Sequence, residues 1–100
     1  MIIAKILGDA ESDLDAAFLY YESARRGLGI EMLTEFRNGI EQILRHPEAW
    51  QSMDERYRRY RLHRFPYGIV YRMGENKDEI LVVAIMHLSQ KPGSWRQRDI

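Results

Sequence analysis

Hydrophobic residues recur along the first half of the chain at helical spacing. From Asp9 to about Arg26, and again from about Ile30 to Arg45, apolar residues return every three or four positions, which predicts two helices. Pro47 disfavours helical geometry at the residue before it, so the second helix is expected to end there. Because only Gly27-Leu28-Gly29 separates the two stripes, we predict an antiparallel helical hairpin with one combined apolar face.

In the second half, the spacing changes to the alternation that is typical of β-strands. Strands are expected over Tyr57–Phe65, Tyr67–Met73 and Glu79–Leu88, and a short one within Met1–Leu7. Glu48–Glu55 is expected to cross between helix and sheet without regular structure. These elements predict one α+β domain, in which the hairpin packs on one face of a mainly antiparallel sheet and the other face is partly open.

Regular pleating assigns the strand side chains to faces. Both faces of Glu79–Leu88 are apolar, which is typical of a central strand. One of these faces is expected to carry Leu81, Val83, Ile85 and His87. On the first long strand, one face is expected to carry Arg59, Arg61 and His63, and the other Arg58, Tyr60, Leu62 and Arg64.

Composition excludes several kinds of site. The chain has no cysteine, which excludes disulfides, thiolate metal sites and cysteine catalysis. Its histidines are too dispersed to predict a metal site, and no P-loop, GxGxxG or GxSxG sequence occurs, so we expect neither a metal nor a cofactor. No stretch approaches the roughly 20 apolar residues that a membrane span needs, and no signal peptide is recognisable. We therefore expect a cytoplasmic protein without a membrane partner.

Charge is distributed unevenly, although the formal net charge is zero. Residues 1–50 hold nine acidic and five basic residues, whereas residues 51–100 hold six acidic and ten basic residues. Such asymmetry favours binding of nucleic acid or of an acidic partner, and it is equally consistent with two solvated faces that happen to differ.

Three segments of the second half follow one another in an order that resembles a known family. They are FPYGIVY (Phe65–Tyr71), VVAIMH (Val82–His87) and KPGSW (Lys91–Trp95), and the succession resembles the RelE/ParE superfamily of toxins from bacterial type II toxin–antitoxin modules. The resemblance implies a toxin that a cognate antitoxin wraps and neutralises. Many relatives carry arginine where Gln90 stands and an aromatic residue where Ser94 stands, which puts the contribution of these positions in doubt.

The superfamily divides by target, and FPYGIVY and the overall spacing look closer to the ParE branch. That branch implies a plasmid-stabilisation toxin that binds DNA gyrase without enzymatic activity. The alternatives are a RelE-like, ribosome-dependent mRNA endoribonuclease and a non-toxic member that only binds antitoxin. A homodimer and a toxin–antitoxin hetero-oligomer both remain open.

Candidate site residues follow from this comparison. If the protein is a nuclease, the residues that supply suitable groups are Arg61, Arg64, Arg72 and His87. The residues expected to bind the target or the antitoxin are Arg59, Arg61, Arg64, Tyr67, Arg72, Gln90, Lys91 and Trp95. For His87 a structural role is the simpler interpretation, and Trp95 is expected to pin the C-terminal tail onto the sheet.

Overall fold

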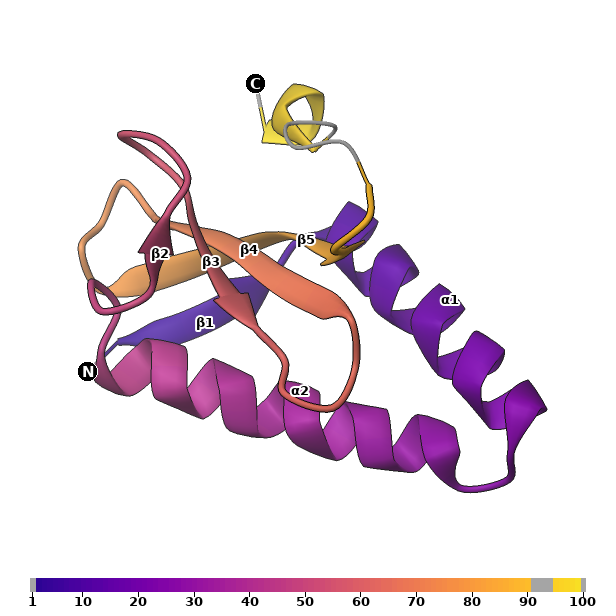
Figure 1. Ribbon diagram of the computed structural model, residues 1–100. Coiled ribbons are helices and arrows are strands. Elements are labelled where there is room, and N and C mark those ends of the chain that lie inside the picture. Colours follow the sequence, from indigo (N-terminus) through magenta and orange to yellow (C-terminus); the bar gives the residue numbers. More distant parts are fainter. Residues whose placement is uncertain (1, 91–94, 100) are drawn as a thin grey trace.

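The computed structural model describes residues 2–90 and 95–99. Within these residues, two helices pack on one face of a five-stranded sheet (Figure 1). The elements in chain order are β1 (Ile3–Ile6), α1 (Gly8–Ala24), α2 (Leu28–Arg45), β2 (Gln51–Ser52), β3 (Arg58–Arg61), β4 (Tyr67–Met73), β5 (Glu79–His87) and the 3-10 helix η1 (Arg96–Asp99). The predicted α+β class and helical hairpin are confirmed.

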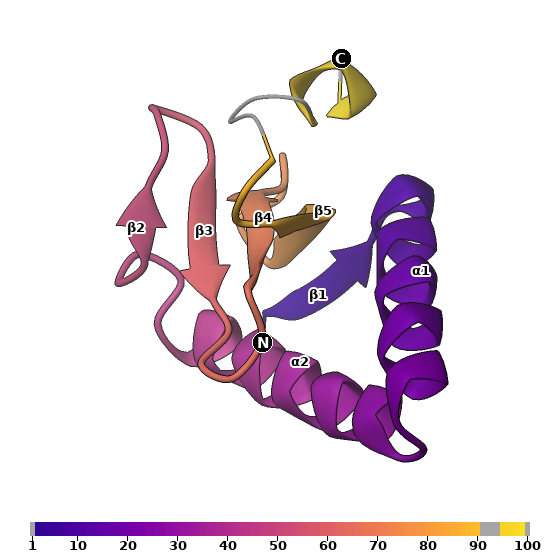
Figure 2. The ribbon, with the colours of Figure 1, turned by 45° about the vertical axis from the view of Figure 1, so that its right-hand side comes forward.

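The sheet has the strand order β1-β5-β4-β3-β2. β1 pairs with β5 in parallel, and the other neighbouring strands pair antiparallel, so the sheet is mainly antiparallel as predicted. β5 lies between β1 and β4, which confirms its predicted central position. Figure 2 shows β1 crossing between the two helices, with α1 and α2 diverging on either side of it.

The larger core cluster fills the space between the helices and the sheet. From α2 it receives Met32, Phe36 and Ile43, which recur at helical spacing. Gly39 on the same helix lets the ring of Tyr60 come close, because a Cβ there would lie 2.9 Å from Tyr60 Cε1. Phe36 and Ile43 of the predicted stripe are thus buried, whereas Ile30 at its start is 56% exposed.

A second cluster occupies the opposite face of the sheet, which the sequence predicted to be partly open. Trp95 is only 1% exposed there and packs edge-to-face on Tyr57, with ring centroids 4.4 Å apart. The cluster consists of Tyr57, Val70, Val83, Ala84, Met86 and Trp95. The expected role of Trp95 in holding the tail on the sheet is confirmed, and part of this face is covered.

The predicted alternation along β5 is wrong around Val83. Val70 on β4 pairs with Ala84 and Tyr71 pairs with Val82, so Val83 is an extra residue between two ladder positions. This bulge moves Val83 to the second cluster, whereas Ile85 packs in the main core. The two residues therefore do not share a face.

Two further boundaries differ from the prediction. β3 ends at Arg61 instead of Phe65, because the chain then turns toward α2 and its main-chain N–H groups bind the Glu35 carboxylate. The segment expected to be irregular contains β2, whose two residues pair with Arg58 and Arg59.

Candidate functional site

Three arginines predicted to bind a partner lie on the sheet face opposite the helices. Arg59 and Arg61 alternate with Tyr60, which is buried in the main core, so both point to the opposite face. Arg72 follows Val70 by two residues on β4, and Val70 belongs to the second cluster. We refer to Arg59, Arg61 and Arg72 as the basic face.

The side chains of the basic face differ in how many contacts they make within the protein. Arg59 lies along the sheet, since its Nη2 donates to Gln51 Oε1 at 2.9 Å and its Cδ would lie 2.7 Å from a Cβ on Gly68. Arg72 Nη1 donates to the main-chain oxygen of Met73 at 2.9 Å. Arg61 is exposed and has no ion pair within the described residues. Arg61 is therefore the arginine of this face most accessible to a partner.

Arg64 lies apart from the basic face, on the loop after β3. Its Nη2 contacts Glu31 Oε1 at 2.7 Å, and Arg25 contacts the other oxygen of Glu31 at 3.2 Å. The hydrogen bonds from Arg64 and Arg25 lower the pKa of the Glu31 carboxyl. Glu35 also accepts the main-chain N–H groups of His63 and Arg64, so two carboxylates of α2 hold this loop.

His87 and Gln90 lie at the C-terminal end of β5. The Ser89 main-chain N–H donates to His87 Nδ1 at 3.1 Å. Gln90 Oε1 accepts the His87 main-chain N–H at 3.2 Å. Tyr67 packs edge-to-face on the imidazole, with centroids 5.1 Å apart, and burial raises the pKa of its hydroxyl. These contacts support the structural interpretation of His87.

The residues proposed for a nuclease site do not converge. Tyr67 pairs with His87 at one end of the β4–β5 ladder, and Arg72 pairs with Leu81 near the other end. Tyr67 and Arg72 are five residues apart on β4, so at about 3.3 Å per residue Arg72 and His87 are roughly 17 Å apart along the strands. Arg64 is bound to α2 through Glu31. No single phosphate could contact all of these groups.

Two ion pairs anchor the C-terminal residues 95–99. Arg96 pairs with Asp54, and its guanidinium lies 4.7 Å from the centroid of the Trp95 ring. Arg98 Nη1 and Nη2 contact Asp13 Oδ2 and Oδ1 at 2.6 and 3.1 Å. Trp95 itself is buried, so its side chain reaches a partner only after this segment moves. Lys91, Ser94 and the Pro92-Gly93 turn lie outside the described residues.

An apolar groove lies between the two helices and β1. Its volume is about 360 Å³, and one charged residue, Arg37, lines it among the described residues. The apolar residues that line it are Ile6, Leu14, Leu33, Phe36 and Ile40. We refer to this site as the apolar groove.

Comparison with known proteins identifies the family. The model for the ParE toxin of the type II toxin–antitoxin system, parDE, matches residues 5–92. The chain belongs to this family. A solved structure described as the chromosomal ParDE TA system from P. aeruginosa superposes with a TM-score of 0.68 and 19% sequence identity. The superposition covers 89% of this chain and 97% of that chain, and at this identity it supports the fold alone. No curated protein matches the sequence.

Sequence reasoning missed three carboxylates that organise this ParE-family toxin. Asp13 binds Arg98 and the Ile85 main-chain N–H, while Glu31 and Glu35 hold the loop after β3. Asp13 lies in an acidic run that the helix dipole already explains, and no local signal distinguishes it from its neighbours. Its partners are distant in sequence, so only the fold identifies them.

Two kinds of site find no support in the described structure. Across residues 2–90 and 95–99, no group of three or more His, Asp or Glu side chains is placed to hold a metal ion. In the same ranges, no helix has the length and apolar character to cross a membrane.

Proposed function

We propose that this toxin inhibits DNA gyrase by binding it through the basic face, in the cytoplasm and without a catalytic group of its own. The wide separation of Arg72 and His87 supports this proposal. Phosphodiester cleavage needs a cation and a proton-transfer group within reach of one phosphate, whereas an inhibitory surface needs only complementary shape and charge. Arg61 is the side chain that we expect to contribute most, because it is exposed and without an ion pair in the described part of the chain.

Induced expression with two readouts tests the target. We expect inhibited supercoiling by gyrase and intact ribosome-bound message. Cleaved message with normal supercoiling would identify the RNA-cleaving alternative, and neither effect would identify a non-toxic member that binds antitoxin alone. Either cleaved message with normal supercoiling or the absence of both effects refutes gyrase inhibition.

Variants of the basic face test where the target binds. Replacing Arg61 with alanine should raise the toxin concentration needed for half-inhibition about fivefold, the effect of losing roughly 1 kcal/mol of interface energy. Arg72→Ala should also weaken inhibition. Arg26→Ala is the matched control, because Arg26 is exposed at the hairpin and carries the same charge. Equal inhibition by Arg61→Ala and Arg26→Ala would place the target surface elsewhere.

We also propose that a cognate antitoxin neutralises the toxin by placing an amphipathic helix in the apolar groove, as part of a plasmid-stabilisation module. The groove is continuous with the core of the hairpin and is lined by apolar side chains around Arg37. An acidic residue on the antitoxin helix would complement this arginine. The ParDE description of the similar structure supports an antitoxin partner.

Paired substitutions on α2 test the groove. Leu33 lines it, whereas Ile30 on the same helix is 56% exposed and does not. Leu33→Glu should weaken binding of the product of the adjacent small gene at least tenfold, because burial of a leucine is worth about 1.5–3 kcal/mol. Ile30→Glu should bind normally. Circular dichroism must show that both variants are folded, and equal binding by both would exclude this groove.

A further inference from the structure

We propose that the basic face contacts DNA directly, by binding the phosphate backbone of the duplex that gyrase holds. This inference rests on the gyrase inhibition proposed above and names a second partner for the same face. Its basis is a regular row of arginines on a surface that lacks exposed apolar side chains in the described structure.

The three arginines of the basic face form a row. Arg59 and Arg61 are two residues apart on β3. Arg72 follows Tyr71, the antiparallel partner of Arg58, so it lies level with the residue before Arg58 on the neighbouring strand. Along the strand direction the row therefore advances by two residues per arginine, or about 6.8 Å at the rise of an antiparallel strand.

This spacing matches the backbone of DNA. Each strand of a duplex carries one phosphate per 3.4 Å of helix axis, so cations about 6.8 Å apart lie opposite every second phosphate of a backbone that runs along the row. Phosphate contacts position a protein on the duplex and carry no sequence information directly. We therefore expect binding that depends on charge and hardly on base sequence.

Arg59 and Arg61 keep their positive charge for a partner. Arg61 is exposed, and neither guanidinium has a carboxylate partner among the described residues. Arg59 Nη2 donates to the neutral amide oxygen of Gln51, and its Nε has no acceptor in the described part of the chain. Gln51 pairs with Arg59 across β2 and β3 and is exposed, so its amide N–H groups can also donate to a phosphate.

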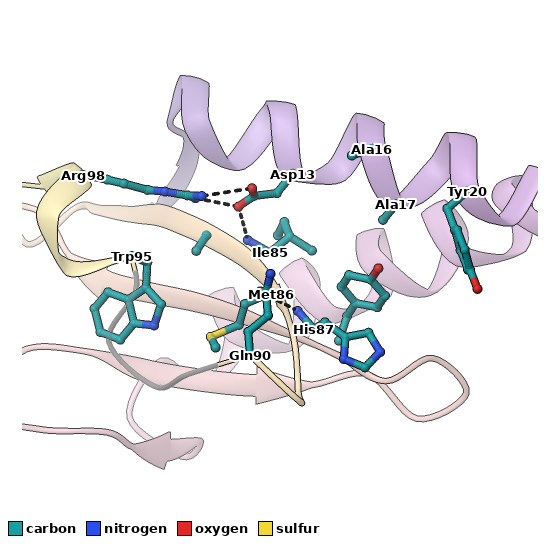
Figure 3. A pocket seen from close by; sticks show the side chains of 12 residues that line it. Asp13, Ala16, Ala17, Tyr20, Ile85, Met86, His87, Gln90, Trp95 and Arg98 are labelled. Carbon is teal, nitrogen blue, oxygen red and sulfur yellow. Dashed lines mark hydrogen bonds and ion pairs between the residues drawn. The ribbon is translucent and has the colours of Figure 1, made fainter.

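The two arginines of the C-terminal residues do not extend the row. Arg98 contacts both oxygens of the Asp13 carboxylate (Figure 3), and Arg96 pairs with Asp54. Their charge is thus compensated within the protein, whereas that of Arg61 is not.

The row ends in a cationic cavity beside Arg72. The cavity has a volume of about 300 Å³, and Arg56, Arg58 and Arg72 line it together with two carboxylates, those of Glu48 and Glu55. Because three guanidinium groups face two carboxylates there, this end of the row remains positively charged.

The basic face offers no apolar anchor to a protein partner within the described residues. The large hydrophobic side chains that are exposed there lie on β1, α1 and α2, and they are Ile3, Leu19, Tyr20 and Ile30. The aromatic residues of the second cluster are buried. Protein–protein interfaces are anchored by aromatic and other apolar side chains, whereas protein–DNA interfaces are more polar and more positively charged. The composition of this face therefore favours a phosphate backbone over an acidic protein surface.

The salt dependence of duplex binding tests the row. The probe is a fluorescently labelled DNA duplex of mixed sequence, and its anisotropy upon addition of the toxin gives Kd. Three phosphate contacts predict a loss of affinity of about 40-fold between about 50 and 200 mM salt, because log K falls with log salt at a slope of about −0.9 per contact. Arg61→Ala removes one contact and should reduce this loss to about 12-fold.

Two variants serve as controls for this measurement. Arg61→Lys keeps the charge and should retain the loss of about 40-fold. Arg26→Ala removes the same charge at the exposed connection of the two helices and should also retain it. Circular dichroism verifies that the variants are folded. Equal salt dependence of Arg61→Ala and the parent protein overturns the row as a DNA contact.

A second experiment separates the DNA contact from gyrase inhibition. The toxin should bind the gyrase–DNA complex at least about fivefold more tightly than gyrase alone, and Arg61→Ala should remove most of this difference. Equal binding with and without DNA overturns the DNA contact and leaves gyrase inhibition standing. Tighter binding of single-stranded RNA than of the duplex at equal salt overturns the choice of DNA. Salt-dependent duplex binding without any effect on gyrase supports the row and overturns gyrase as the target.

Discussion

Replacing Glu22 with alanine is expected to destabilise the helical hairpin by about 2 kcal/mol. The Glu22 carboxylate closes the connection between the helices, because Oε2 accepts the Gly27 N–H at 2.9 Å and Oε1 accepts the Gly29 N–H at 3.0 Å. Both donors lie at the start of α2, where main-chain N–H groups have no partner within the helix. Gly27 has a φ of 88°, so this turn is one that most other residues would adopt only under strain.

The magnitude follows from the two hydrogen bonds. A hydrogen bond to a charged group contributes about 1.5–3 kcal/mol. Because water can reach and partly replace both bonds at this turn, the two together should contribute roughly 1.5–3 kcal/mol. Glutamate and alanine have similar helix propensities, so the exchange adds little of its own. Glu22→Gln keeps one neutral acceptor and should lose about 1 kcal/mol.

Urea unfolding followed by circular dichroism measures this loss. In thermal unfolding of a chain of this length, a loss of about 2 kcal/mol lowers Tm by roughly 8–16 °C. Glu41→Ala is the control, because Glu41 is exposed on α2 and has no hydrogen bond or ion pair among the described residues. It should stay within about 0.5 kcal/mol of the parent protein. If Glu22→Ala stays within the same range, the carboxylate does not hold the turn.

Two further predictions concern titration. The pKa of Asp54 is about 2, because Arg96 and then the Arg56 and Tyr57 N–H groups donate to its carboxylate. Since this folded pKa lies below the unfolded value, the stabilisation by Asp54 is present above about pH 4 and lost as pH falls toward 2. Arg96→Ala should raise the titration midpoint of the Asp54 carboxyl measured by NMR. Burial raises the pKa of Tyr71 to about 12, with Arg58 opposing, so its contribution is present below about pH 10 and lost as pH rises toward 12. Tyr71→Phe should remove the high-pH ionisation step from a near-ultraviolet titration, and an unchanged titration curve would contradict this assignment. The substitution should also cost about 1 kcal/mol of stability, because the Tyr71 hydroxyl donates to Pro47 O at 2.7 Å.

The helical part of the fold was predictable because its signal is local. The apolar stripe predicted for α2 follows the spacing of Leu33, Phe36 and Ile40, and the break at Gly27 and Gly29 lies inside a short stretch of sequence. Each of these features needs only its sequence neighbours to be recognised. The hairpin was therefore predicted with boundaries within two residues of the observed ones.

The features that depend on distant residues were not predictable. The bulge at Val83 is held by Asp13, through the Ile85 N–H, and by Arg98, through the Val83 oxygen. Likewise, β3 is short because Glu35 of α2 binds the main chain beyond it. Alternation within a strand contains no information about either contact. The candidate site shows the same limit, since Arg61 was placed on the correct strand, whereas the separation of Arg72 from His87 became visible only with the register of β4 and β5.

The ion pairs of the fold explain part of the uneven charge distribution along the sequence. Arg98 pairs with Asp13 and Arg64 with Glu31, so basic residues of the second half neutralise acidic residues of the first half within the fold. Arg96 pairs with Asp54, which lies in the same half of the chain. Part of the asymmetry is thus used within the fold, where these two ion pairs hold the C-terminal residues and the loop after β3 in place. On the basic face, Arg61 is exposed and has no ion pair among the described residues, so we expect a target that binds by charge to make contact there.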